Sequence, residues 1–282
     1  MSQPGAPDVL LAAKPGKTSP HAESRAFQMA ARSGGRVRLL YVVDEPGQGA
    51  GAAPDSLAEA VSQRAPAGVG WDVSVGRGEP WRAILQAAEA SGCGLIVMGP
   101  RERGGMGARL MGTTGEHVIH RARQPVLTVR RPAEAPYRHV VAAIDFSEGS
   151  RQALVAAAPW VDGAEIALLH AYRVPYEGFL SREANADEVR ASAEADCARF
   201  LAEGGWPPGL GERVEPEMAY GTPLEVLAAR AREGRADLVV VGAHGQTGPF
   251  EKLLGGTAEQ LLSELLTDLL VAAQSQAHRR GA

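Results

Sequence analysis

The chain has 282 residues, of which 45% are hydrophobic and 22% charged, and its formal net charge is −4. This length suits one large domain or two domains of about 140 residues, and the charge argues against a nucleic-acid partner. With only Cys93 and Cys197, neither a disulfide scaffold nor a cysteine-rich metal site is expected. No apolar stretch approaches the ~18 residues that a membrane span needs, and no signal-peptide pattern is visible, so we expect a cytoplasmic protein with no membrane partner.

The sequence contains an internal repeat, with similar segments in its two halves. The segment LIVMGPRERGGMGARLMGTTGEHV (95–118) runs parallel to LVVVGAHGQTGPFEKLLGGTAEQL (238–261), and RLLYVVDEP (38–46) matches ALLHAYRVP (167–175). Internal repeats of this kind indicate repeated structural units. We therefore predict two tandem domains, 1–132 and 137–282, joined by a proline-containing linker.

Each half alternates short apolar strands with helices of about 12 residues, a pattern typical of a parallel sheet with helices on both faces. In the second half the expected strands are 139–145, 165–172, 213–220, 236–242 and 268–272. The expected helices are 146–161, about 183–203, 222–233 and 256–266. Ser147 is the expected N-cap of the first helix, and Pro216 marks the strand 213–220 as an edge strand. The predicted fold class is α/β.

In such folds, ligands bind beyond the carboxyl ends of the strands, where the strand order reverses. Gly242 ends a central strand, and Gly255, Gly256 and Thr257 stand at the start of a helix, whose unpaired N–H groups suit phosphate oxygens. Asp145, after the first strand, stands where an acid can meet a ribose hydroxyl or a cation. Alternatively, the glycines only permit a turn and Gly-Thr is an ordinary helix cap.

These motifs resemble the universal stress protein family in its tandem two-domain form. The resemblance rests on AID (143–145), GTPLEVLAARAREGRADLVVVGAHG (221–245) and LLGGTAE (253–259). It implies Rossmann-like, five-stranded parallel sheets of order 3-2-1-4-5, paired as an intramolecular pseudo-dimer, with a homodimer also open. It further implies that ATP, with Mg²⁺ possible, is bound by Asp145, Ala171, Gly242, Gly245 and Gly255. Gly256 and Thr257 at the helix start are further expected contacts, and His244, inside the glycine loop, is a neighbour that could touch phosphate.

The chain departs from the family pattern G-x-x-G-x9-G-[S/T] in both halves. In the second half Gly256 takes the Ser/Thr position and Thr257 follows one place later. In the first half Glu102 replaces the second glycine, although Gly112 and Thr113 are kept. The first strand of that half ends in Lys14-Pro15, without an aspartate. We therefore expect the first half to bind nucleotide poorly or not at all.

No catalytic or metal site is expected. His117 and His120 have a chelating spacing, but no third ligand is evident, and His170 is expected to be a packed polar group. The leading hypothesis is an ATP-binding stress-response sensor or adaptor with an unknown protein partner. The alternatives are an interaction module with a remnant glycine loop and, less favoured, an adenine-nucleotide hydrolase.

Overall fold

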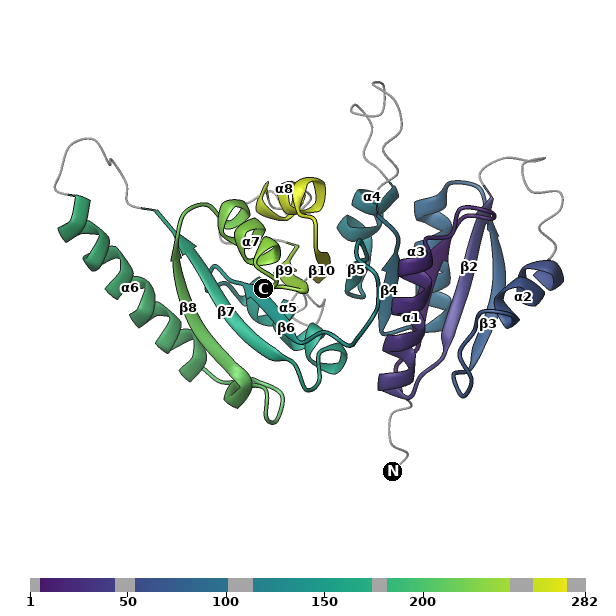
Figure 1. Ribbon diagram of the computed structural model, residues 1–282, viewed down its shortest axis with the longest axis horizontal. Coiled ribbons are helices and arrows are strands. Elements are labelled where there is room, and N and C mark those ends of the chain that lie inside the picture. The colour runs from purple at the N-terminus through teal and green to yellow at the C-terminus, as the bar shows by residue number, and fades with distance from the viewer. Residues whose placement is uncertain (1–5, 44–53, 101–113, 174–181, 244–255, 273–282) are drawn as a thin grey trace, which may run out of the picture. The chain divides into compact units, whose positions relative to one another are not determined.

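The structure is a computed structural model that describes residues 6–43, 54–100, 114–173, 182–243 and 256–272 (Figure 1). The chain divides into two compact units, Met1–Pro136 (unit 1) and Tyr137–Ala282 (unit 2). Within the described residues, no helix is long and apolar enough to cross a membrane.

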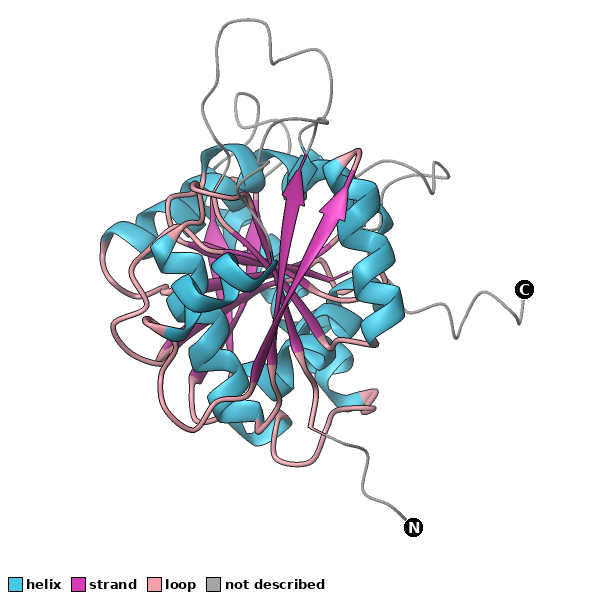
Figure 2. Ribbon diagram, turned by 90° about the vertical axis from the view of Figure 1, so that its right-hand side faces the viewer, coloured by secondary structure: helices cyan, strands magenta, loops and turns pink. Residues whose placement is uncertain are grey.

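Unit 1 is one parallel sheet of five strands in the order β3-β2-β1-β4-β5. Figure 2 looks onto this unit and shows helices on both sides of its twisted strands. Its strands are β1 (Val9–Ala13), β2 (Val37–Val43), β3 (Trp71–Arg77), β4 (Leu95–Met98) and β5 (Val126–Thr128). Its helices are α1 (Pro20–Ser33), α2 (Pro54–Ser62), α3 (Pro80–Ser91) and α4 (Thr114–Arg121).

Unit 2 repeats this layout, with the strand order β8-β7-β6-β9-β10. The strands are β6 (His139–Ala143), β7 (Glu165–Tyr172), β8 (Val214–Tyr220), β9 (Leu238–Gly242) and β10 (Asp268–Ala272). The helices are α5 (Glu148–Ala157), α6 (Arg182–Ala202), α7 (Pro223–Arg232) and α8 (Gly256–Glu264), with short 3₁₀ turns at Ala158–Trp160 and Gly211–Arg213. In both units the order is 3-2-1-4-5, so the predicted fold class is confirmed.

The strands that the sequence reads as continuous apolar runs form the core. In β4 the residues Leu95, Ile96 and Val97 are fully buried, as are Leu238 to Val240 of β9. Crossovers between parallel strands are right-handed as a rule, and in this strand order the rule puts the first two helices of each unit on one face and the last two on the other. The contacts of α3 with α4 and of α7 with α8 agree with this layering.

The helix starts follow the sequence signals. Ser19 and Ser147 are N-caps of α1 and α5, and their hydroxyls accept bonds from Ala22 N and Ser150 N. Strand β8 lies at the edge of its sheet and contains Pro216, as expected. Helix α8 ends at Glu264, two residues before the expected end.

Candidate functional site

The candidate site lies at the carboxyl edge of unit 2. Strand β6 lies between β7 and β9, with Ala142 opposite Leu168 on one side and Val240 on the other. The chain leaves β6 toward β7 and later returns to β9, so the strand order reverses at this point. Asp145 follows β6, Ala171 lies near the end of β7 and Gly242 ends β9. Three of the predicted residues are therefore on the ends of three adjacent strands.

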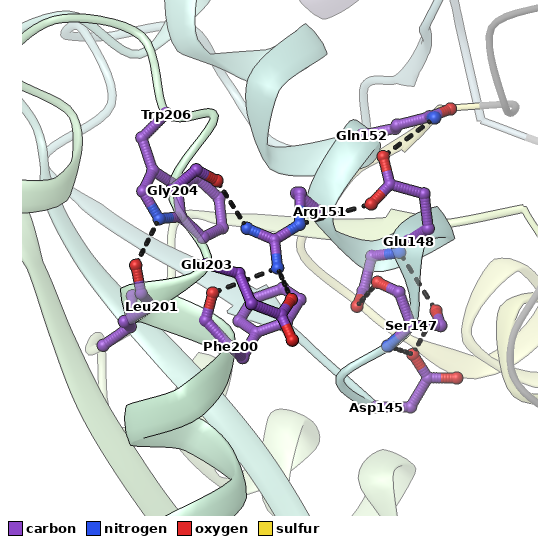
Figure 3. Close-up of polar contacts among 11 residues, drawn as sticks. Asp145, Ser147, Glu148, Arg151, Gln152, Phe200, Leu201, Glu203, Gly204 and Trp206 are labelled. Atoms are coloured by element: carbon purple, nitrogen blue, oxygen red, sulfur yellow. Dashed lines mark hydrogen bonds and ion pairs between the residues drawn. The ribbon is translucent and has the colours of Figure 1, made fainter. Parts of the chain in front are cut away.

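The turn after β6 holds Asp145 in a defined orientation (Figure 3). Its Oδ1 accepts bonds from the Ser147 backbone N–H at 3.1 Å and the Ser147 hydroxyl at 2.5 Å. The intervening Phe146 has φ of 60°, a left-handed conformation that is uncommon outside glycine. Asp145 is half-buried, so its carboxylate stands at the rim of this edge and not inside the core.

The ring of Phe146 explains how this turn is held. It stacks on His170 of β7, with centroids 4.4 Å apart, and meets the edge of Phe200 in α6 at 6.0 Å. His170 in turn donates its Nδ1–H to the carbonyl of Ile144 at 3.0 Å. Packing against two other elements offsets the backbone cost of the positive φ. His170 is thus a packed polar group that supports the turn.

Helix α8 begins at the predicted phosphate contacts. Gly256 and Thr257 are exposed in its first turn, where the backbone N–H groups have no partner within the helix. A Cβ added at Gly256 would meet nothing within 4 Å, so neither packing nor a positive φ requires glycine there. The predictions on His244, Gly245 and Gly255 lie outside the described residues, as do those on Glu102, Gly112 and Thr113 of unit 1.

In unit 1 the first glycine of the motif has a packing role. A Cβ added at Gly99, at the end of β4, would lie 2.9 Å from the Cβ of Ser19, the N-cap of α1. Such an approach is closer than real Cβ atoms make, and the obstacle is rigid because it is close to the backbone. This glycine is therefore explained by the close approach of two turns at the sheet edge, without a ligand.

Arg151 of α5 is a central residue of unit 2 that the sequence analysis did not single out. It is 8% exposed, and its guanidinium donates to the carbonyls of Gly204 at 2.7 Å and Phe200 at 3.0 Å (Figure 3). It also forms ion pairs with Glu203 and Glu148. Arg151 thereby pairs with the C-terminal carbonyls of α6, where a cation is favoured. The other buried residues of α5 are small or apolar, so an arginine among them was the signal available in the sequence.

The described residues include no group of three or more histidine, cysteine or acidic side chains that could hold a metal ion. His117 instead stacks on Trp81 with centroids 5.5 Å apart, and its Nδ1 accepts a bond from Arg121 at 3.2 Å. Burial raises the pKa of both cysteine thiols, Cys93 and Cys197, so these thiols are poor nucleophiles.

Known proteins match this chain along both units. The universal stress protein family model matches residues 7–130 and again 136–273. A universal stress protein of Mycolicibacterium smegmatis is 26% identical over 208 residues, covering 67% of this chain and 64% of that protein. Universal stress protein E of Escherichia coli K12 is 23% identical over 222 residues, covering 70% and 66%. The matched region thus spans just under two thirds of the length of these curated relatives.

Solved structures agree on the fold. A protein of unknown function from Pseudomonas aeruginosa PAO1 superposes with a TM-score of 0.68 at 20% identity, covering 96% of this chain and 94% of the other. A universal stress protein from Archaeoglobus fulgidus gives 0.65 at 20% identity, covering 95% and 96%. With the family model matching each unit once, the chain belongs to the universal stress protein family, in its tandem two-domain form.

Proposed function

We propose that unit 2 binds the adenine nucleotide ATP. We further propose that the protein acts in the cytoplasm as a stress-response sensor or adaptor and not as a catalyst. The observation that carries this proposal is the oriented carboxylate of Asp145 next to the glycine-ended strand β9, at the point where the strand order reverses. Ligands of open α/β sheets bind at this place. Asp145 would meet the ribose, and Ala171 would border the adenine.

The start of α8 supports the phosphate end of this site. The N–H groups of its first turn and the partial positive charge of a helix N-terminus both favour phosphate oxygens. Gly256 and Thr257 are exposed there, so a phosphate can approach the backbone. The proposed contacts of His244, Gly245 and Gly255 complete the loop, and Mg²⁺ would accompany the phosphates.

Unit 1 would not share this activity. In place of an aspartate after the first strand it has Lys14-Pro15, and Glu102 would bring a carboxylate toward the phosphates. We propose that nucleotide occupies unit 2 alone.

One observation favours a second function, an interaction module with a remnant glycine loop. Gly99 shows that the first glycine of the motif can be kept for packing, and Gly256 removes the family's hydroxyl at the phosphate position. On this alternative the protein would bind its partner with an empty nucleotide site.

The experiment is to purify the full chain from cells, denature it and identify the released nucleotide by mass spectrometry. The same is done with Asp145→Ala and with Asp187→Ala, which removes an exposed carboxylate from α6 of the same unit. We expect adenine nucleotide from the wild type and from Asp187→Ala, and at least tenfold less from Asp145→Ala.

The other outcomes separate the functions. A protein that releases no nucleotide and fails to bind added ATP is the interaction module. Equal nucleotide from both variants would rule out the role of Asp145. Steady-state ATP turnover well above ~1 per second, an ordinary enzymatic rate, would show a hydrolase.

A further inference from the structure

Unit 1 contains a cleft of about 840 Å³ between α1 and α2. This volume is within the range of about 300–1,000 Å³ that is typical of small-molecule sites. The lining is mostly apolar and small, with a few polar groups. Its residues include Thr18, Phe27, Tyr41, Ala60, Arg64 and Pro66.

The same place in unit 2 is filled by aromatic side chains. There Phe200 meets the edge of Phe146 with centroids 6.0 Å apart, and the edge of Trp206 at 5.4 Å. The Arg151 guanidinium lies over Phe200 at 4.4 Å and over Trp206 at 4.8 Å, as cation–π contacts. The space between α5 and the end of α6 is therefore occupied by the protein itself.

The first two helices of each unit can be compared by counting from their ends. Phe146 immediately precedes the N-cap Ser147, and Thr18 precedes the N-cap Ser19. Phe200 stands two residues before the end of α6, as Ala60 does before the end of α2.

Trp206 follows the end of α6 by four residues, as Pro66 follows the end of α2. Each of the three aromatic positions of unit 2 therefore has a smaller, non-aromatic residue in unit 1. All three of these residues, Thr18, Ala60 and Pro66, line the cleft. Counted from the helix ends, the cleft therefore lies where unit 2 carries these three aromatic side chains.

The cleft also contains aromatic side chains and one ion pair. Tyr41 takes the β2 position that His170 takes in β7, and Phe27 of α1 adds a second ring to the lining. Arg64 forms a two-point ion pair with Glu23, through Nε at 3.0 Å and Nη2 at 3.2 Å. The Glu23 side chain is 9% exposed and the Arg64 side chain 49%. The pair is neutral as a whole, so the cleft favours an uncharged ligand, while the guanidinium can still contact a ring face.

We propose that the cleft between α1 and α2 binds an uncharged, planar aromatic small molecule, whose rings take the place that Phe200 and Trp206 occupy in unit 2. This site is separate from the nucleotide site proposed for unit 2. Arg64 contacts the ligand ring as Arg151 contacts the rings of unit 2.

The test uses the full chain and N-phenyl-1-naphthylamine, an uncharged dye that fluoresces in apolar surroundings. We expect saturable binding to the wild type, with indole displacing the dye and the aliphatic 1-decanol failing to do so. Ala60→Phe restores the side chain of unit 2 and should weaken dye binding at least tenfold. Ala90→Phe is the matched control, since it adds the same ring to an exposed position of α3, and should leave binding unchanged.

A second variant, Pro66→Trp, fills the same space from the loop and decides the result if Ala60→Phe fails to fold. Circular dichroism shows which variants are folded. The proposal is overturned by a wild type that does not bind the dye, or by undiminished binding in the folded filling variants. Displacement by 1-decanol would overturn the aromatic class, and displacement by ATP would place the dye elsewhere.

Discussion

Glu23 and Arg151 occupy the same position in the two units and carry opposite charges. Each stands four residues after an N-cap serine, in the first turns of the first helix, and each is buried. Glu23 pairs with Arg64 just after α2, and Arg151 pairs with Glu203 just after α6. The two repeats thus tie their first two helices together with the same ion pair in reversed polarity. Buried charges require such partners.

Arg151→Met should destabilise unit 2 by about 2–3 kcal/mol, the usual cost of losing hydrogen bonds to a buried charged group. The carbonyls of Phe200 and Gly204 would lose their donor. Hydrogen exchange of the amides in the last turns of α6 measures this loss within unit 2 alone. Arg199→Met removes an exposed ion pair with Asp196 on the same helix and should change exchange little. Equal effects of the two variants would contradict the assigned role of Arg151.

Gly99→Ala should destabilise unit 1 by about 1–3 kcal/mol, because the new methyl group would clash with the Cβ of Ser19. Ser19→Gly removes that Cβ and, as an N-cap change, should cost only roughly a few tenths of a kcal/mol. The double variant should therefore recover most of the stability that Gly99→Ala loses. Urea unfolding, followed by circular dichroism, measures all three. Additive losses would show that the contact with Ser19 is not the cause.

Glu225 should make the stability of the protein depend on pH. Hydrogen bonds from Thr222 and the nearby Arg173 lower the pKa of this carboxyl, which closes a capping box at the start of α7. A lowered folded-state pKa stabilises the fold above the ordinary pKa of a glutamate, and this contribution is lost as the pH falls through the folded value.

Glu225→Gln should therefore melt at a lower temperature than the wild type at pH 7, and the gap should close under acidic conditions. Thermal unfolding at a series of pH values checks this. A gap that stays constant, or widens in acid, would contradict the assignment.

Gly256→Ser should strengthen nucleotide binding about 3- to 10-fold, if the hydroxyl adds one hydrogen bond to phosphate. The position can accept the side chain, since an added Cβ meets nothing within 4 Å. Gly256→Ala is the matched control, with the same backbone change and no hydroxyl. Titration calorimetry with ATP on the full chain compares the three proteins. If serine and alanine bind alike, the hydroxyl has no phosphate partner.

Much of the fold could be predicted from the order of apolar and polar residues. Strand β9 is buried up to its final glycine and is a continuous apolar run because helices cover both faces of the sheet. This signal does not depend on which residues are its neighbours in space. The helix starts at Ser147 and Pro223 were equally visible, since a cap and an N1 proline act within one turn.

The site could be predicted only in outline. The positions of Asp145 and Gly242 follow from strand ends, and the repeat shows which glycines correspond. The packing reason for Gly99 could not be seen, because it depends on a contact with Ser19, 80 positions earlier in the chain. The sequence alone does not distinguish a glycine that is needed for packing from one that is needed for a ligand.

By itself the sequence determined the repeat and the order of strands and helices, because these follow from local periodicity and chain order, and it predicted the edge at which we propose a ligand. Only the tertiary structure decided which side chains fill the space between the first two helices. In unit 2, Arg151 donates a hydrogen bond to the carbonyl of Phe200 and lies over the ring of Trp206, which are about 50 residues later in the sequence. In unit 1 the corresponding space is a cleft lined by the Arg64–Glu23 ion pair. Burial, ring stacking and ion pairing depend on distances in space, which the spacing of residues along the chain does not fix.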